Sequence, residues 1–175
     1  GGGWWWHTQD DTYDKVDLNI LWRDTQIHAH WLEGLLTQTA LPLDPLTYLN
    51  GLQQSLAELA ASVSPEFDLS AVAEKLQQLQ PVLSELTTNW QTEPQIWQPQ
   101  MKQAIAGLHR LRYSSVDDFH YDLSYRGGAF PGFQELAARR EDTSPEMWLM
   151  MTTRFRRQHD RALALLENVE AICRS

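Results

Sequence analysis

The sequence predicts an all-α protein: an antiparallel bundle of four to five long helices, with an irregular N-terminal segment and a loop rich in aromatic residues and glycine. Two observations favour this class. Apolar residues recur at intervals of three and four along most of the chain, which is the spacing of a helix with a buried face. Prolines separate these segments, and short turns of this kind join antiparallel helices. A chain of 175 residues can bury a core without a metal or a crosslink.

The first expected helix begins after Asp17 and ends before Pro42. It has a broad apolar stripe made of Leu18, Leu21, Trp22, Thr25, His28, Leu32, Leu35 and Leu36. A second, narrower stripe is made of Ile20, Ile27 and Trp31. A helix that is apolar on two sides is expected to lie between neighbours, within the bundle or between the bundle and another domain. His28 belongs to the broad stripe, so we expect it to be a core histidine.

Each later helix is expected to begin close to a proline, often beside a polar residue that can cap it. The second follows Asp44-Pro45 and turns inward Leu46, Leu49, Leu52, Leu56, Leu59 and Val63. The third has a coiled-coil-like seam of Leu69, Val72, Leu76, Leu79, Leu83, Leu86 and Trp90. The fourth follows Pro94 or Pro99 and turns inward Trp97, Met101, Ala104, Ile105, Leu108 and Leu111. The last follows Ser144-Pro145 and turns inward Trp148, Met151, Phe155, Ala162, Leu166, Val169 and Ile172.

The helical pattern is interrupted between residues 113 and 132. Aromatic and polar residues alternate from Phe119 to Tyr125, which is the period of an extended strand. Gly127-Gly128 and the proline that follows indicate an ordered loop. A short helix is then expected over residues 133–140.

The charge balance excludes two classes of partner. The chain has 14 Lys+Arg against 23 Asp+Glu, a net charge of -9, so nucleic acid and anionic membrane surfaces are not expected partners. No apolar run approaches the roughly 20 residues that cross a membrane. Cys173 is the only cysteine, so neither an internal disulfide nor a cysteine-based zinc cluster is expected. The basic run from Arg154 to Arg161 forms either a solvated, salt-bridged face or a contact for a partner.

The N-terminal segment differs from the helices because it is dense in aromatic residues and carboxylates. His7, Asp10, Asp11 and Asp14 lie within eight residues. Imidazole and carboxylate together suit zinc or manganese. The alternative is that the aspartates cap turns and the first helix. The residues alone favour the capping interpretation.

Residues Trp6 to Lys15 read Trp-His-Thr-Gln-Asp-Asp-Thr-Tyr-Asp-Lys. This motif resembles the end of the catalytic domain in the co-catalytic zinc aminopeptidase family, which includes glutamate carboxypeptidase and the inactive transferrin receptor. The resemblance implies that His7 is the last of five ligands in a two-zinc site, with Asp11 and Asp14 holding the turn. It also implies that residues 1–16 are the tail of a peptidase domain.

The segment from Leu111 to Phe133 resembles the inter-helix loop of the transferrin-receptor-like dimerisation domain, so residues 17–175 would be that helical domain. The chain starts without methionine, and we expect its natural start upstream. The expected function is a helical scaffold or dimerisation-like domain of a zinc-dependent aminopeptidase or carboxypeptidase. Its partners would be the missing peptidase domain and, in a homodimer, a second copy.

The resemblance places the other zinc ligands and the general base upstream, so this chain alone is expected to have no peptidase activity and no bound cofactor. Two alternatives stay open. One is a helical interaction module with no enzymatic parent, and the other is part of a degenerate, non-catalytic family member. Upstream sequence with histidine and acidic ligands on a parallel-sheet domain would distinguish the first alternative from an enzymatic parent.

The other histidines indicate no further site. His28 and His30 point about 200° apart on a helix, so they cannot share a metal. His109, His120 and His159 are scattered, and nothing ties them to a shared site; His120 with Asp122 in the aromatic loop is the one pair for which a role is considered.

Overall fold

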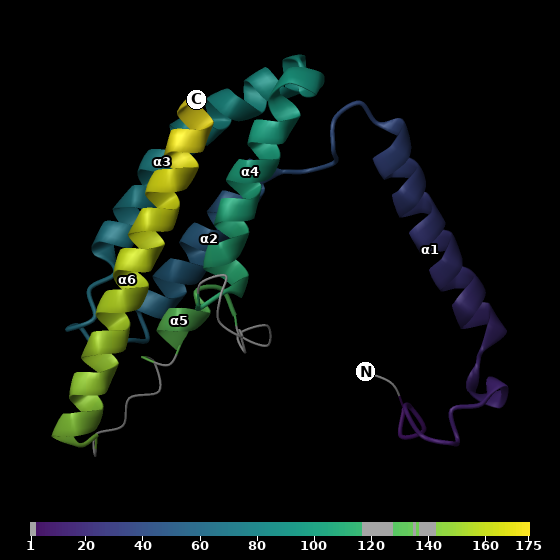
Figure 1. Cartoon of the computed structure of the whole chain (residues 1–175), viewed down its shortest axis with the longest axis horizontal. Helices are drawn as coiled ribbons and strands as arrows, with labels where there is room; N and C mark the ends of the chain where they lie inside the picture. The colour runs from purple at the N-terminus through teal and green to yellow at the C-terminus, as the bar shows by residue number, and fades with distance from the viewer. Residues whose placement is uncertain (1–2, 117–127, 135, 137–142) are drawn as a thin grey trace. The chain divides into compact units, whose positions relative to one another are not determined.

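The computed structural model describes residues 3–116, 128–134, 136 and 143–175 (Figure 1). The described residues form helices and irregular segments, with no strand among them, so the predicted all-α class is confirmed. The chain divides into two compact units, Gly1–Pro42 and Leu43–Ser175. The sequence suggested a boundary after residue 16, between the tail of a peptidase domain and the helical domain. That assignment stays a prediction. As a compact unit, however, that segment belongs with the first long helix.

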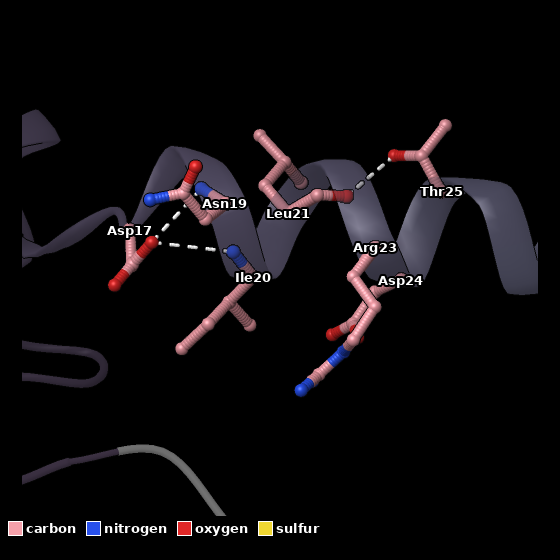
Figure 2. A network of polar contacts seen from close by, with 7 residues as sticks. All are labelled: Asp17, Asn19, Ile20, Leu21, Arg23, Asp24 and Thr25. Atoms are coloured by element: carbon pink, nitrogen blue, oxygen red, sulfur yellow. Dashed lines mark hydrogen bonds and ion pairs between the residues drawn. The ribbon is translucent and has the colours of Figure 1, made fainter.

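The first unit contains a short 3-10 helix, η1 (Tyr13–Lys15), and one long helix, α1 (Leu18–Thr37). The carboxylate of Asp17 caps α1 by accepting hydrogen bonds from the amides of Asn19 and Ile20 at 2.9 and 3.2 Å (Figure 2). This bonding satisfies two of the amides that a helix leaves unpaired at its N-terminus. The helix therefore begins where the sequence predicts.

The second unit is a bundle of α2 (Pro45–Ala60), α3 (Ser70–Thr92), α4 (Pro94–Tyr113) and α6 (Pro145–Arg174), with the short α5 (Pro131–Gln134) beside them. The four long helices alternate in direction along the chain, as an antiparallel bundle requires (Figure 1). Two predicted starts are confirmed, because side-chain caps occupy them. Asp44 accepts from the amide of Thr47 at 2.9 Å, and Ser144 accepts from the amide of Met147 at 3.2 Å.

The predicted seam of α3 is the centre of the core. All seven of its residues are buried, from Leu69 before the helix to Trp90 near its end. α3 packs against α2, α4 and α6, and α4 also packs against α6. The two helices α4 and α6 approach closely at Gly107, where an added Cβ would lie 2.4 Å from a methyl carbon of Val169. Only glycine fits this approach without a shift of the Val169 side chain.

The fourth helix begins at Pro94 and contains Pro99, which decides between the two starts that the sequence allowed. A short helix does follow the interruption, but it covers Pro131–Gln134, and the expected helix over 133–140 falls mostly outside the described residues. The expected extended stretch from Phe119 to Tyr125, with His120 and Asp122, also lies outside them.

One expectation about α1 is wrong for this chain. No residue of α1 is buried, and His28, predicted to be a core histidine, is exposed. The periodic pattern correctly predicts a helix with apolar stripes. It does not show whether another surface covers those stripes, and burial depends on that.

None of the helices in the described ranges combines the length and the apolar character needed to span a membrane.

Candidate functional site

His7 lies in a series of tight turns before α1. Its backbone has φ of 63°, a left-handed conformation that is uncommon for a residue with a side chain. The imidazole packs against the indole of Trp6, with ring centroids 4.0 Å apart. The side chain is exposed. The segment therefore presents the imidazole at its surface with an aromatic ring on one side.

Thr8 and Thr12 organise the turns around His7. The hydroxyl of Thr8 donates to the carbonyl of Trp5 at 2.6 Å and accepts from the amide of Asp10 at 3.2 Å. The hydroxyl of Thr12 donates to the carboxylate of Asp14. These are local bonds between side chains and backbone of the kind that threonine and aspartate form in turns.

Asp14 takes part in the turn. Its carboxylate also pairs with Lys15, and the hydrogen bonds from Lys15 and Thr12 lower the pKa of Asp14 below its ordinary value. This supports the capping interpretation for Asp14, because its oxygen atoms are engaged by neighbours in the same turn. Asp11 belongs to the same series of turns, in which its backbone amide donates to the carbonyl of Thr8 at 3.2 Å.

The described residues do not fit a zinc site on their own. No three of their histidine, cysteine, aspartate and glutamate side chains are placed to hold one metal ion. A zinc ion in a protein takes at least three protein ligands, so His7 is not part of a complete zinc site among the residues that the structure describes.

The surface of α1 is the largest unusual feature of the first unit. Its apolar side chains are exposed on both stripes, with Leu36 at 82%, Trp31 at 65% and Trp22 at 64%. The polar contacts of the helix are local (Figure 2). Arg23 pairs with the adjacent Asp24 at 2.8 Å, and the hydroxyl of Thr25 donates to the carbonyl of Leu21 at 2.7 Å. Exposed apolar surface of this extent is a feature that protein interaction sites share.

The bundle has an apolar groove of about 390 Å³ between the end of α2 and the start of α3. Its apolar lining includes Leu56, Val63, Pro65, Phe67 and Leu69. Asp68 also lines the groove, but its carboxylate accepts from the amide of Ser70 at 2.9 Å, a bond that lowers its pKa. The groove thus contains a carboxylate occupied in a turn, and the hydroxyl of Ser64, which also lines it, donates to the carboxylate of Glu66.

The basic run on α6 includes a structural contact that the sequence did not indicate. The guanidinium of Arg161 donates to the carbonyls of Ser114 and Val116, both at 3.0 Å, and to the hydroxyl of Ser114 at 3.1 Å. The amide group of Gln158 donates to the carbonyl of Ser115 at 2.8 Å. Arg161 and Gln158 therefore fix the chain where it leaves α4, and Arg161 is not simply part of a solvated face.

Cys173 is half-buried in the last turn of α6. Burial, with a smaller contribution from the charge of Glu170, raises the pKa of its thiol to about 11. Glu170 itself pairs with Lys75 of α3 at 2.6 Å and with Arg174 at 2.9 Å. This end of α6 is thus tied to α3 by an ion pair.

Comparisons with protein-family profiles, with curated proteins and with solved structures found no match to this chain.

Proposed function

We propose that this chain is a helical scaffold domain of a zinc-dependent aminopeptidase- or carboxypeptidase-like protein, in which α1 packs against a peptidase domain. The single observation that carries the proposal is the exposure of both apolar stripes of α1. The motif from Trp6 to Lys15 directly precedes that helix and is the one that resembles the end of a zinc-peptidase domain. A peptidase domain from which this motif continues would lie beside α1.

The size of the exposed surface supports a permanent partner. Burying a leucine or isoleucine side chain that was exposed contributes about 1.5–3 kcal/mol. The stripe residues that would contribute are Leu18, Ile20, Leu21, Trp22, Ile27, Trp31, Leu32, Leu35 and Leu36. In proteins most of the stability of a helix comes from tertiary packing of its apolar face. A covering domain would therefore stabilise α1 as well as bind it.

In this proposal the chain supplies support and at most one metal ligand. His7 would join a zinc site whose other ligands belong to the peptidase domain, and hydrolysis of a peptide or related amide would take place there. A two-metal hydrolase activates water and polarises the carbonyl with its ions. The described side chains of this chain hold neither ion, so the activity belongs to the assembled protein.

The proposal is tested first by the coding sequence upstream of Gly1. We expect it to encode a parallel-sheet domain with histidine and acidic ligands for two metals. Hydrogen exchange then tests the role of α1 in the complete protein. The amides of α1 should exchange quickly in the isolated chain and slowly in the complete protein, whereas the amides of α3 should be protected in both. An upstream sequence without such a domain would overturn the proposal, as would rapid exchange of α1 in the complete protein.

Zinc binding by the isolated chain gives a second test. Calorimetry at neutral pH should show no zinc binding above background for the chain or for a His7→Ala variant, because no three described side chains are placed to hold one metal ion. Tight binding that disappears in the variant would mean that a site is completed within the chain or by a second copy. The assignment of the other ligands to a peptidase domain would then be wrong.

A helical interaction module without an enzymatic parent is the second candidate. The exposed stripes of α1 are also compatible with this candidate, because they would suit a second copy or another protein, and the motif from Trp6 to Lys15 is what favours the peptidase-like protein over it. Light scattering across a range of chain concentrations distinguishes self-association from a monomer. A dimer that is lost in a Leu32→Glu variant would favour this candidate and would place α1 in the interface.

A further inference from the structure

A cluster of aromatic and basic side chains joins α2 and α4. Tyr48 of α2 lies against His109 of α4, with ring centroids 4.8 Å apart, and its hydroxyl oxygen is 3.3 Å from Nδ1 of His109. The ring of Tyr113 stacks on the ring of His109, with ring centroids 5.5 Å apart. Arg112 lies 5.8 Å from the ring centre of Tyr48 and 5.7 Å from that of Tyr113.

The two basic residues of this cluster share one face of α4. His109 and Arg112 are three residues apart, a spacing that places side chains side by side on a helix. The guanidinium of Arg112 is within cation–π range of both tyrosine rings. Stacking engages the planar faces of a guanidinium and leaves the N–H groups at its edge available for a planar anion. Arg112 forms no hydrogen bond or ion pair with another described residue, and its side chain is partly exposed.

The hydroxyl of Tyr48 sets the hydrogen-bonding state of His109. Burial raises the pKa of Tyr48 to about 12, so the hydroxyl keeps its proton at neutral pH. It can donate that proton to Nδ1 of a neutral imidazole, which then carries its own proton on Nε2. His109 is exposed, and in the tautomer whose Nδ1 accepts from Tyr48 its Nε2–H is a second donor beside the guanidinium. Tyr48 is therefore a positioning residue for this pair.

The charge around the pair contrasts with the chain as a whole. The chain has a net charge of -9, yet Arg110 and Arg112 both lie in the last turn of α4. The nearest carboxylate in sequence to Tyr48 is Asp44, one turn earlier, and it is engaged by the amide of Thr47. No ion pair joins Asp44 to Arg112 in the described part of the chain. Among the described residues, the cluster thus contains the cationic side chain of Arg112 and no carboxylate paired with it.

We propose that Arg112 and His109 bind a side-chain carboxylate of an acidic protein segment. A carboxylate accepts two parallel hydrogen bonds from an arginine fork, and this bidentate geometry is stronger and more specific than a point charge. The tyrosine rings hold the fork in place before binding, which lowers the entropy cost of ordering it. This proposal is independent of the peptidase proposal, because it involves only α2 and α4 of the bundle.

The test is a nuclear magnetic resonance titration of the labelled chain with an acetylated, amidated tetraglutamate peptide. A tetraglutamine peptide is the uncharged control, and inorganic phosphate is the alternative anion. We expect the Arg112 side-chain Nε–H and the His109 ring to shift with tetraglutamate only. Arg112→Gln should weaken binding about tenfold or more, since it removes a charge-assisted pair. Lys102→Gln removes the same charge from an exposed site on the same helix and should change affinity less than about twofold.

Three outcomes would overturn the proposal: equal weakening by the two variants, shifts with phosphate alone, or no shift of Arg112 and His109 at millimolar peptide. If Arg112→Gln does not fold, Arg112→Lys serves instead, because it keeps the charge and loses the fork. Tyr48→Phe keeps the ring and removes the hydroxyl. It should weaken binding about threefold and change the ring nitrogen shifts of His109, which a merely structural role of Tyr48 would leave unchanged.

Discussion

α1 and α3 are alike in length and in the spacing of their apolar residues, but the apolar residues of α1 are exposed and those of α3 are buried. They contain 20 and 23 residues, and both present apolar side chains at helical spacing. The seam residues within α3 are at most 2% exposed, whereas the apolar stripes of α1 are 45–82% exposed. The comparison teaches that periodicity specifies which face of a helix is apolar, while the rest of the protein decides whether that face is covered.

The difference also separates two sources of helix stability. α1 has a capping carboxylate at Asp17 and local pairs such as Arg23 with Asp24, but no buried residue. α3 has no side-chain cap at its N-terminus and is held by burial along its whole length. Caps and local pairs contribute about 1 kcal/mol or less each, whereas a buried leucine contributes several times as much.

A pair of leucine substitutions gives the largest expected contrast. Leu76→Ala in α3 should lower the free energy of unfolding by about 2–5 kcal/mol, because Leu76 is fully buried and its loss leaves a cavity. Leu21→Ala in α1 should change it by less than about 0.5 kcal/mol, because Leu21 is already exposed. Urea unfolding followed by circular dichroism measures both. A comparable loss in Leu21→Ala would show that α1 is buried against the rest of the chain.

Two glycine substitutions probe close packing and should have a smaller effect. Gly107→Ala should destabilise the bundle by about 1–3 kcal/mol, because its Cβ would meet Val169 at the contact of α4 with α6. Gly51→Ala in α2 meets nothing within 4 Å and should stabilise by about 0.5–1 kcal/mol through helix propensity. Thermal unfolding of the two variants should shift the midpoint in opposite directions. A shift in the same direction would contradict the close approach of the two helices.

The smallest expected effect is the loss of stability in acid that Glu170 causes. The ion pair with Lys75, and then the one with Arg174, lowers the pKa of Glu170 below its ordinary value. The stability from this group is therefore present above the unfolded-state pKa of about 4.5 and is lost as pH falls through the lower folded-state value. Urea midpoints measured from pH 6 downward should fall less steeply for Glu170→Gln than for the parent chain.

Glu167→Gln is the matched control for this experiment. Glu167 is exposed on the same helix and makes no ion pair with any residue that the structure describes. Its variant should keep the acid dependence of the parent chain. An unchanged slope in Glu170→Gln would mean that the link between α3 and α6 adds nothing to stability.

Much of the bundle could be predicted from sequence because its signals are local. Asp44-Pro45 and Ser144-Pro145 are start signals whose caps form within three residues, and the α3 seam repeats every three or four residues. The same local reasoning predicted His28 in the core, since its stripe is the strongest apolar pattern of α1. It failed there because burial requires a surface from another part of a protein.

The contacts that organise the bundle surface could not be predicted in this way. Tyr48 and His109 are 61 residues apart, and Arg161 and Ser114 are 47 apart. Such pairs depend on how the helices are packed, which no short-range pattern contains. For the N-terminal segment, the aspartates were predicted to hold turns, and Asp14 does so. The role of His7 in a metal site stays a prediction, because its other ligands would come from outside the chain.

The thiol of Cys173 has a consequence for how the chain behaves in air. With a pKa of about 11, roughly one thiol in 10⁴ is ionised at neutral pH. Thiolate is the form that attacks alkylating reagents and disulfides, so this sulfur should react far more slowly than an exposed cysteine. Copies of the chain should therefore become linked by a disulfide more slowly than copies that carry an exposed cysteine.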